Sequence, residues 1–221
     1  MDIIPAIDLL GGKCVRLYQG DYSKETVYSE SPESVAVQWV KLGASRLHVV
    51  DLDGAKIGKP TNLEAIRAIV AATNVPIQLG GGIRTLASAK EALDMGVDRI
   101  IVGTVAIEQP ALVAELCVDF GTENIIVGVD SKDGHVAVRG WMKGTSTSVL
   151  ELARNMADIG IKRIMYTDVS RDGTLTEPNY RAVKELVDRS GLQILAAGGI
   201  ATTDQLTKLA RIGVEATIVG K

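Results

Sequence analysis

The sequence contains few cysteines and histidines, and each scarcity excludes a class of chemistry. Cys14 and Cys117 are the only cysteines in 221 residues. They lie far apart and match no metal-ligand spacing, so we expect two reduced thiols and a cytoplasmic protein. The only histidines are His48, inside an apolar segment where we expect a structural role, and His135, in an expected hairpin. We therefore predict no metal site, and assign acid–base chemistry to carboxylates.

Long apolar runs and basic blocks are also missing. No apolar run approaches the ~18 residues that a membrane span needs. The opening segment MDIIPAIDLL carries no basic stretch of the kind that precedes a secretory signal. The net charge is −3 without a cluster of Lys or Arg, so binding to nucleic acid has no electrostatic support. We expect neither a membrane nor a nucleic acid as partner.

Aromatic residues make up only 4% of a chain that is 46% hydrophobic. The core must therefore be built from Val, Ile, Leu and Ala, a composition typical of parallel strands that are buried on both faces. A length of 221 residues suits one α/β barrel domain.

Short β-branched segments alternate with amphipathic ones along the whole chain. The segments predicted as strands are 3–7, 46–50, 76–79, 99–102, 125–129, 163–167, 193–196 and 216–219. The segments predicted as helices are 32–42, 62–73, 86–95, 109–119, 147–159, 178–190 and 203–212. Capping boxes are predicted at Thr61 with Glu64 and at Thr202 with Gln205. Glycines that end helices in the left-handed conformation are predicted at Gly43, Gly96, Gly160 and Gly213.

An internal repeat distinguishes between the possible parallel-sheet folds. Asp51 aligns with Asp168, Gly81 with Gly198, and Gly103 with Gly220, each at an offset of 117 residues (168 − 51, 198 − 81, 220 − 103). Strict alternation alone permits an open doubly wound sheet or a closed barrel. Two repeated four-stranded halves favour a (β/α)8 TIM barrel.

We therefore predict a single (β/α)8 barrel domain over 1–221, with half-barrels at about 1–121 and 122–221. The sequence stops at Lys221, directly after the eighth predicted strand, so the final helix is absent from the given chain. We expect the native protein to be longer. Without that helix, apolar surface between the eighth and first strands should be exposed.

Two aspartates are candidates for acid–base catalysis. Active sites of barrel enzymes lie at the C-terminal ends of the strands, and Asp8 follows the first strand while Asp130 follows the fifth, on the opposite side. One carboxyl group removes a proton and the other supplies one if their pKa values differ. The alternative is that each aspartate caps its own turn, because DLLGG and DSKDG are turn-like. The symmetric pair favours catalysis.

Glycines follow four other strands. They are Gly81 and Gly82 after the third strand, Gly103 with Thr104 after the fourth, Gly198 and Gly199 after the seventh, and Gly220 after the eighth. Glycine lets backbone N–H groups approach an anion, and the following helix N-terminus adds a favourable dipole. The alternative is that these glycines only permit tight strand–helix turns. Because the pattern is duplicated, we predict two phosphate sites and a small-molecule ligand with a phosphate at each end.

The remaining candidates lie at other strand ends and in three long loops. Asp51 and Asp168 orient substrate hydroxyls or support loops, and Thr167 offers a hydroxyl beside the substrate. The long loops carry Arg16, then Arg139 with Trp141, then Arg171 with Asp172. Such loops suit a lid over an anionic heterocyclic ligand. For Trp141, stacking on the ligand and packing within its loop are equally supported.

Five motifs together resemble the half-barrel family of histidine biosynthesis. Within it they resemble the isomerases that act on phosphoribosylformimino-5-aminoimidazole carboxamide ribonucleotide, called ProFAR. They are IIPAIDLLGGKCVRLYQGDY, HVVDLDGA, QLGGGIRT, GVDSKDGHVAVRGW and YTDVSRDGTLTEPN, and they occur in order at the expected strand ends. The resemblance covers the whole chain except the final helix. It implies a cofactor-free Amadori rearrangement of an aminoaldose to an aminoketose, on a substrate with two phosphates.

The resemblance also implies residue roles. Asp8 would be the general base that takes the C2 proton, Asp130 the general acid that opens the ribose ring, and Thr167 an assisting residue. It places Gly82, Gly103 and Thr104 at one phosphate, and Gly199 and Gly220 at the other. Three alternatives remain open, namely the sister cyclase, an isomerase that also acts on phosphoribosylanthranilate, and a phosphosugar-binding module without catalysis. The oligomeric state leaves no mark in the sequence, and a monomer is the expectation.

Overall fold

The computed structural model describes residues 1–18, 20–132, 134–138 and 143–220, and within them parallel strands alternate with helices. The parallel strands are β1 (Asp2–Leu10), β4 (Leu47–Asp51), β5 (Ile77–Gly80), β6 (Arg99–Val102), β7 (Ile125–Lys132), β10 (Arg163–Asp168), β11 (Gln193–Ala197) and β12 (Ala216–Val219). The principal helices are α1 (Pro32–Lys41), α3 (Leu63–Ala72), α4 (Leu86–Asp94), α6 (Pro110–Phe120), α7 (Val149–Ile159), α8 (Tyr180–Arg189) and α9 (Thr203–Ile212).

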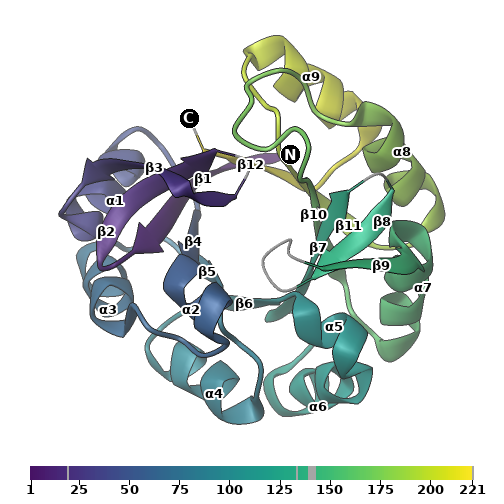
Figure 1. Cartoon of the computed structure of the whole chain (residues 1–221), viewed down its shortest axis with the longest axis horizontal. Helices are drawn as coiled ribbons and strands as arrows, with labels where there is room; N and C mark the ends of the chain where they lie inside the picture. The colour runs from purple at the N-terminus through teal and green to yellow at the C-terminus, as the bar shows by residue number, and fades with distance from the viewer. Residues whose placement is uncertain (19, 133, 139–142, 221) are drawn as a thin grey trace.

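These strands close into a barrel. Hydrogen-bonded neighbours run in the order β10-β11-β12-β1-β4-β5-β6-β7, and β7 pairs in turn with β10. Figure 1 looks along the barrel axis and shows the helices as an outer ring around the strands. The predicted (β/α)8 TIM barrel is therefore confirmed, and the predicted strand segments agree with the observed ones apart from small shifts at their ends.

The helix-end signals predicted from the sequence are observed, with one exception. Thr202 and Gln205 form the predicted capping box of α9, and the four predicted glycines have φ between 97° and 100°. The capping box predicted at Thr61 is wrong, because α3 begins after Asn62 and has no side-chain cap. The backbone N–H of Thr61 donates instead to the Asp51 carboxylate at 2.6 Å. A tertiary hydrogen bond thus replaces the local one.

Two of the predicted long loops are hairpins. The first contains β2 (Lys13–Tyr18) and β3 (Asp21–Ser29), which pair antiparallel with each other and extend β1. The second contains β8 (His135–Val138) and β9 (Lys143–Ser148), which extend β7. Strand β3 is almost entirely exposed, so it lacks the apolar alternation by which strands are recognised. Two short helices, α2 (Leu52–Ile57) and α5 (Thr104–Glu108), lie over the rim of the barrel in Figure 1.

The apolar core has two parts. The larger lies between the barrel and the helices, and the smaller fills the barrel interior. The interior cluster consists of Ile4, Ala6, Ile101, Ile126, Leu195, Ala216 and Ile218, with Met165 and Ala197 packed against it. Nearer the C-terminal ends of the strands, the residues that face the barrel interior are small, as at Gly80 and Gly128. Side chains therefore no longer fill the interior there, and a cavity opens above the apolar cluster.

Apolar surface is exposed where β1 and β12 pair. Met1 is 44% exposed and Ile3 is 46% exposed. This agrees with the exposure expected from the sequence in the groove between the eighth and first parallel strands.

Candidate active site

One cavity of about 310 Å³ occupies the C-terminal mouth of the barrel. Asp8, Asp130 and Thr167 line it from β1, β7 and β10. In the closed barrel β1 and β7 are separated by three strands on either side, so the two aspartates project into the cavity from opposite walls. The structure thus brings together the three residues that the sequence suggested for catalysis.

Asp8 is held by an arginine from the first hairpin. Arg16 Nη1 lies 2.6 Å from Asp8 Oδ2, the distance of a charge-assisted hydrogen bond. The same guanidinium donates to the carbonyl oxygens of Gly220 and Ala6, at 2.9 Å from Nε and 2.5 Å from Nη2. Arg16 therefore bridges β1 and β12 and fixes the direction of Asp8. It also lines the cavity, where a substrate would meet it.

A third carboxyl group, Asp172, lies near the other two in the same cavity. Burial, together with the negative charges of Asp8 and Asp130, raises its pKa from 3.8 to about 6. A carboxyl with a pKa near the working pH is suited to proton transfer. The sequence singled out Asp172 only as a member of a long loop, because the offset of 117 pairs it with Ala55 (172 − 117 = 55), which has no carboxylate.

The paired aspartates Asp51 and Asp168 support loops. Asp51 is fully buried, caps α2 by accepting from Gly54 N, and accepts from the Asn62 amide at 2.7 Å. Asp168 accepts from the Asn179 amide at 2.8 Å. The spacing is the same in both halves, eleven residues (62 − 51 and 179 − 168). Of the two roles considered for these aspartates, the observed contacts are those of loop support.

The paired glycines are required by close packing between neighbouring loops. A Cβ on Gly81 would lie 2.1 Å from the Asp51 carbonyl oxygen, and one on Gly82 would lie 2.6 Å from the Lys59 carbonyl carbon. In the second half, Gly199 meets the Glu177 carbonyl oxygen at 2.4 Å, and Gly198 meets that of Asp168 at 3.0 Å. All four have positive φ. Packing therefore explains their identity without a ligand, although all four also line the cavity.

The glycine after the fourth parallel strand is packed less tightly than the paired glycines. Gly103 precedes α5, and its missing Cβ would meet only the Gly128 carbonyl oxygen at 3.6 Å, an ordinary contact. Gly103, Thr104 and Gly220 all line the cavity. A Cβ at Gly103 would therefore meet no close neighbour, unlike one at Gly81 or Gly199.

The chain is similar in sequence to proteins of histidine biosynthesis. A sequence model of the family described as "Histidine biosynthesis protein" matches residues 2–221. This chain belongs to that family.

Relatives in the family cover the whole chain. A protein of Dehalococcoides mccartyi is 51% identical over 221 residues, which are all of this chain and 93% of that protein. Proteins of Gloeothece citriformis and Chloroflexus aurantiacus are each 50% identical over all of this chain, which spans 87% and 91% of their lengths. All three are named 1-(5-phosphoribosyl)-5-((5-phosphoribosylamino)methylideneamino)imidazole-4-carboxamide isomerase.

The candidate residues of the later long loops do not all lie at the cavity. Arg171 turns into its own loop, where Nη1 donates to the Glu177 carbonyl at 2.9 Å and Nε lies 3.7 Å from Asp168. It is not among the described residues that line the cavity. Arg139 and Trp141 lie outside the described residues. Over the described part of the chain, no cluster of three His, Cys, Asp or Glu side chains is arranged to hold a metal ion. No helix in that part is long and apolar enough to cross a membrane.

Proposed function

We propose that this chain is the isomerase of histidine biosynthesis that converts ProFAR, an aminoaldose, into its aminoketose isomer by an Amadori rearrangement. The observation that carries the proposal is the pair Asp8 and Asp130 on opposite walls of one cavity. The names of relatives about half identical over the entire chain support it. We further propose a monomeric single-domain enzyme of the cytoplasm that needs no cofactor.

The first step opens the ribose ring. Asp130 donates a proton to the ring oxygen, the bond between that oxygen and C1 breaks, and the nitrogen on C1 forms a Schiff base. Thr167 pairs in register with Asp130 on the neighbouring strand, so its hydroxyl is placed to contact the same part of the substrate.

The second step moves hydrogen between carbons. Asp8 removes the C2 proton, which yields an enolamine, and then returns a proton to C1. The C2 hydroxyl loses its proton to the Asp130 carboxylate as the ketone forms, so both aspartates end as they began. The contact with Arg16 keeps Asp8 in one position through both transfers, and such positioning contributes directly to rate.

Asp172 is a second candidate for the acid. Its raised pKa of about 6 leaves about a tenth of the carboxyl protonated at pH 7, far more than for an ordinary aspartate, and ring opening requires the protonated form. It lines the same cavity as Asp130. The choice between the two carboxyls is open to experiment through their separate asparagine variants.

Two phosphate sites would hold the substrate ends. We place one at Gly82, Gly103 and Thr104, and the other at Gly199 and Gly220, all of which line the cavity. The two groups lie at the ends of β5–β6 and β11–β12, on opposite sides of the barrel. A ligand that spans them lays its centre between Asp8 and Asp130.

Turnover of ProFAR, followed by its absorbance change, tests the proposal. We expect wild-type protein to isomerise ProFAR and Asp8→Asn to lose about 10²- to 10⁴-fold in kcat. Binding of ProFAR by Asp8→Asn, measured by calorimetry, should remain within a few-fold of wild type. Asp158→Asn, an exposed carboxylate on α7, is the matched control and should retain full activity. Wild-type protein that binds ProFAR without converting it would instead make the chain a phosphosugar-binding module.

A further inference from the structure

Two neighbouring polar side chains lie inside the barrel, between its charged base and the cavity. His48 on β4 is 4% exposed and Gln78 on β5 is fully buried. They are register partners on adjacent strands, and Gln78 Nε2 lies 3.1 Å from His48 Nδ1. The interior around them is the cluster of Ile, Leu, Met and Ala side chains described above. Burial of polar groups in such surroundings costs free energy unless they are hydrogen-bonded, so the pair calls for a reason beyond packing.

The contact with Gln78 defines which nitrogen of His48 carries the proton. An amide nitrogen can only donate, so Nδ1 of His48 accepts from Gln78 and the imidazole proton must be on Nε2. Burial, together with the positive charge of Arg16, lowers the pKa of His48 to about 4. The imidazole is thus neutral over the physiological range, with a fixed tautomer.

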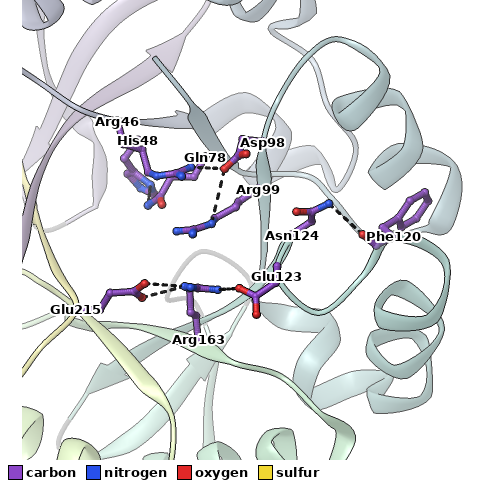
Figure 2. Close-up of polar contacts among 10 residues, drawn as sticks. All are labelled: Arg46, His48, Gln78, Asp98, Arg99, Phe120, Glu123, Asn124, Arg163 and Glu215. Atoms are coloured by element: carbon purple, nitrogen blue, oxygen red, sulfur yellow. Dashed lines mark hydrogen bonds and ion pairs between the residues drawn. The ribbon is translucent and has the colours of Figure 1, made fainter. Parts of the chain in front are cut away.

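Charged side chains lie at the base of the barrel, next to Gln78. Arg99 is the register partner of Gln78 on β6, and Arg46 stands two residues before His48. Figure 2 shows these two arginines with Asp98, and Arg163 with Glu123 and Glu215, gathered at this end of the barrel. Each of these guanidinium groups is paired with a carboxylate, so the direction of the Gln78 amide rests on its contact with His48.

The other nitrogen of His48 is directed at the cavity. Among the described residues, the fully buried side-chain polar atoms without a hydrogen bond are Gln78 Oε1 and Thr217 Oγ1. His48 Nε2 has no protein partner in the same part of the chain and yet is not among these atoms, so it is accessible. Because His48 lines the cavity, the accessible N–H belongs to the cavity floor.

His48 lies deeper in the barrel than Asp8, the proposed general base. Ala6 pairs with His48, and Asp8 pairs with Val50, so His48 sits on the strand next to Asp8 and one inward position deeper. Arg16 also joins this half of the cavity, since its charge reaches His48 and its guanidinium contacts Asp8. A substrate atom bonded to the carbon that Asp8 deprotonates would then lie on the same side of the cavity as the Nε2 proton.

We propose that His48, held by Gln78 as the neutral Nε2–H tautomer, donates a hydrogen bond to the oxygen on substrate C2. The inference rests on the proposed function for the identity of that oxygen. The bond strengthens as the hydroxyl becomes a carbonyl oxygen, and a preorganised neutral donor in a dry site favours that change. His48 transfers no proton, so the proton balance between Asp8 and Asp130 is unchanged.

Nitrogen NMR of protein labelled with ¹⁵N-histidine tests the tautomer without any assay of activity. The chain has only two histidines, and His135 is exposed, so the two sets of signals are separable. We expect His48 to show a protonated Nε2 and an unprotonated Nδ1 with no titration from about pH 5.5 to 8.5. In Gln78→Glu the carboxylate accepts instead, and the proton should move to Nδ1. A protonated Nδ1 in the wild type would overturn the inference.

Binding and kinetics test the contact with substrate. Adding ProFAR to Asp8→Asn protein, which does not consume it, should shift the His48 Nε2 signal. His48→Leu removes the donor and should lower kcat about 10- to 100-fold with little change in KM, as expected for loss of one preorganised donor. His48→Gln restores an N–H near the same place and should recover part of the loss. Ile126→Val, a change within the same interior cluster, controls for packing and should keep kcat.

The outcomes separate the two proposals. If wild-type protein turns over ProFAR and His48→Leu, folded by urea titration, keeps the wild-type kcat, the contact with C2 oxygen is wrong and the proposed function stands. If wild-type protein binds ProFAR without turnover, the proposed function fails, and the NMR result still decides the tautomer.

Discussion

Removal of the Asp172 charge should make the protein more stable and less active at once. The folded pKa of Asp172 is raised from 3.8 to about 6, so the folded protein binds this proton more tightly than the unfolded chain does. Unfolding stability therefore falls as pH rises through 3.8 and levels off above about 6. A shift of about 2 units corresponds to about 3 kcal/mol. Because the side chain is only partly buried, we expect about 2 kcal/mol.

Asp172→Asn keeps the shape of the neutral acid without its titration. We expect its free energy of unfolding, from urea titrations, to exceed that of the wild type by about 2 kcal/mol at pH 8. The excess should shrink steadily toward pH 4, where the wild-type carboxyl is protonated in the folded state and about half protonated in the unfolded chain. Turnover of ProFAR should fall at every pH, as is usual when a strained functional group is replaced.

Asp158→Asn is the control for charge alone, because Asp158 is exposed on α7. It should change stability by less than about 0.5 kcal/mol at any pH. The reasoning about Asp172 fails if its asparagine variant is no more stable than wild type at pH 8. It also fails if the gain is the same at pH 5 and pH 8, since a constant gain comes from packing and not from titration.

Three further variants probe the scaffold around the site. Gly81→Ala places a Cβ 2.1 Å from the Asp51 carbonyl oxygen at a positive φ and should lower the free energy of unfolding by about 3 kcal/mol or more. The Cβ of Gly80→Ala would lie 3.6 Å from Ile101, so this variant should lose about 1 kcal/mol or less. Equal losses in urea titrations would contradict the packing explanation. Arg163→Met leaves Glu123 and Glu215 without their shared partner. It should lower the melting temperature by several degrees in thermal unfolding, and an unchanged melting temperature would contradict a stabilising role for these ion pairs. Arg16→Met frees Asp8 and should lower kcat about tenfold in steady-state assays, more than it lowers affinity for ProFAR, and an unchanged kcat would remove Arg16 from the positioning of the base.

The barrel could be predicted because its signals are local and repeated. Strand segments are short β-branched runs, and helices end at glycines such as Gly160 and Gly213 that adopt the left-handed conformation for backbone reasons alone. The constant offset of 117 residues then placed equivalent strand ends opposite one another. Since the C-terminal ends of parallel strands meet at one face of the barrel, Asp8, Asp130 and Thr167 were expected there together, as the structure has them.

Elements with weak local signals were missed. Strand β3 is polar and exposed, and its pairing with β2 comes from a hairpin register that hydrophobic periodicity does not record. The capping box at Thr61 satisfied the local rule, yet Asp51, ten residues earlier, captured the Thr61 N–H instead. A hydrogen bond between distant segments competes with a local one only after the chain has folded.

The sequence by itself determined the fold class, the doubled architecture and the identity of the two facing aspartates, because these depend on periodicity and on residue types at strand ends. Only the tertiary structure decided what the glycines and the inner polar residues do. Gly81 and Gly199 face the backbone of neighbouring loops, Asp172 gains its raised pKa from burial beside two other carboxyls, and His48 has its tautomer set by Gln78. Steric contact, burial and electrostatic proximity arise between residues far apart in the chain, and a linear pattern carries no record of those distances.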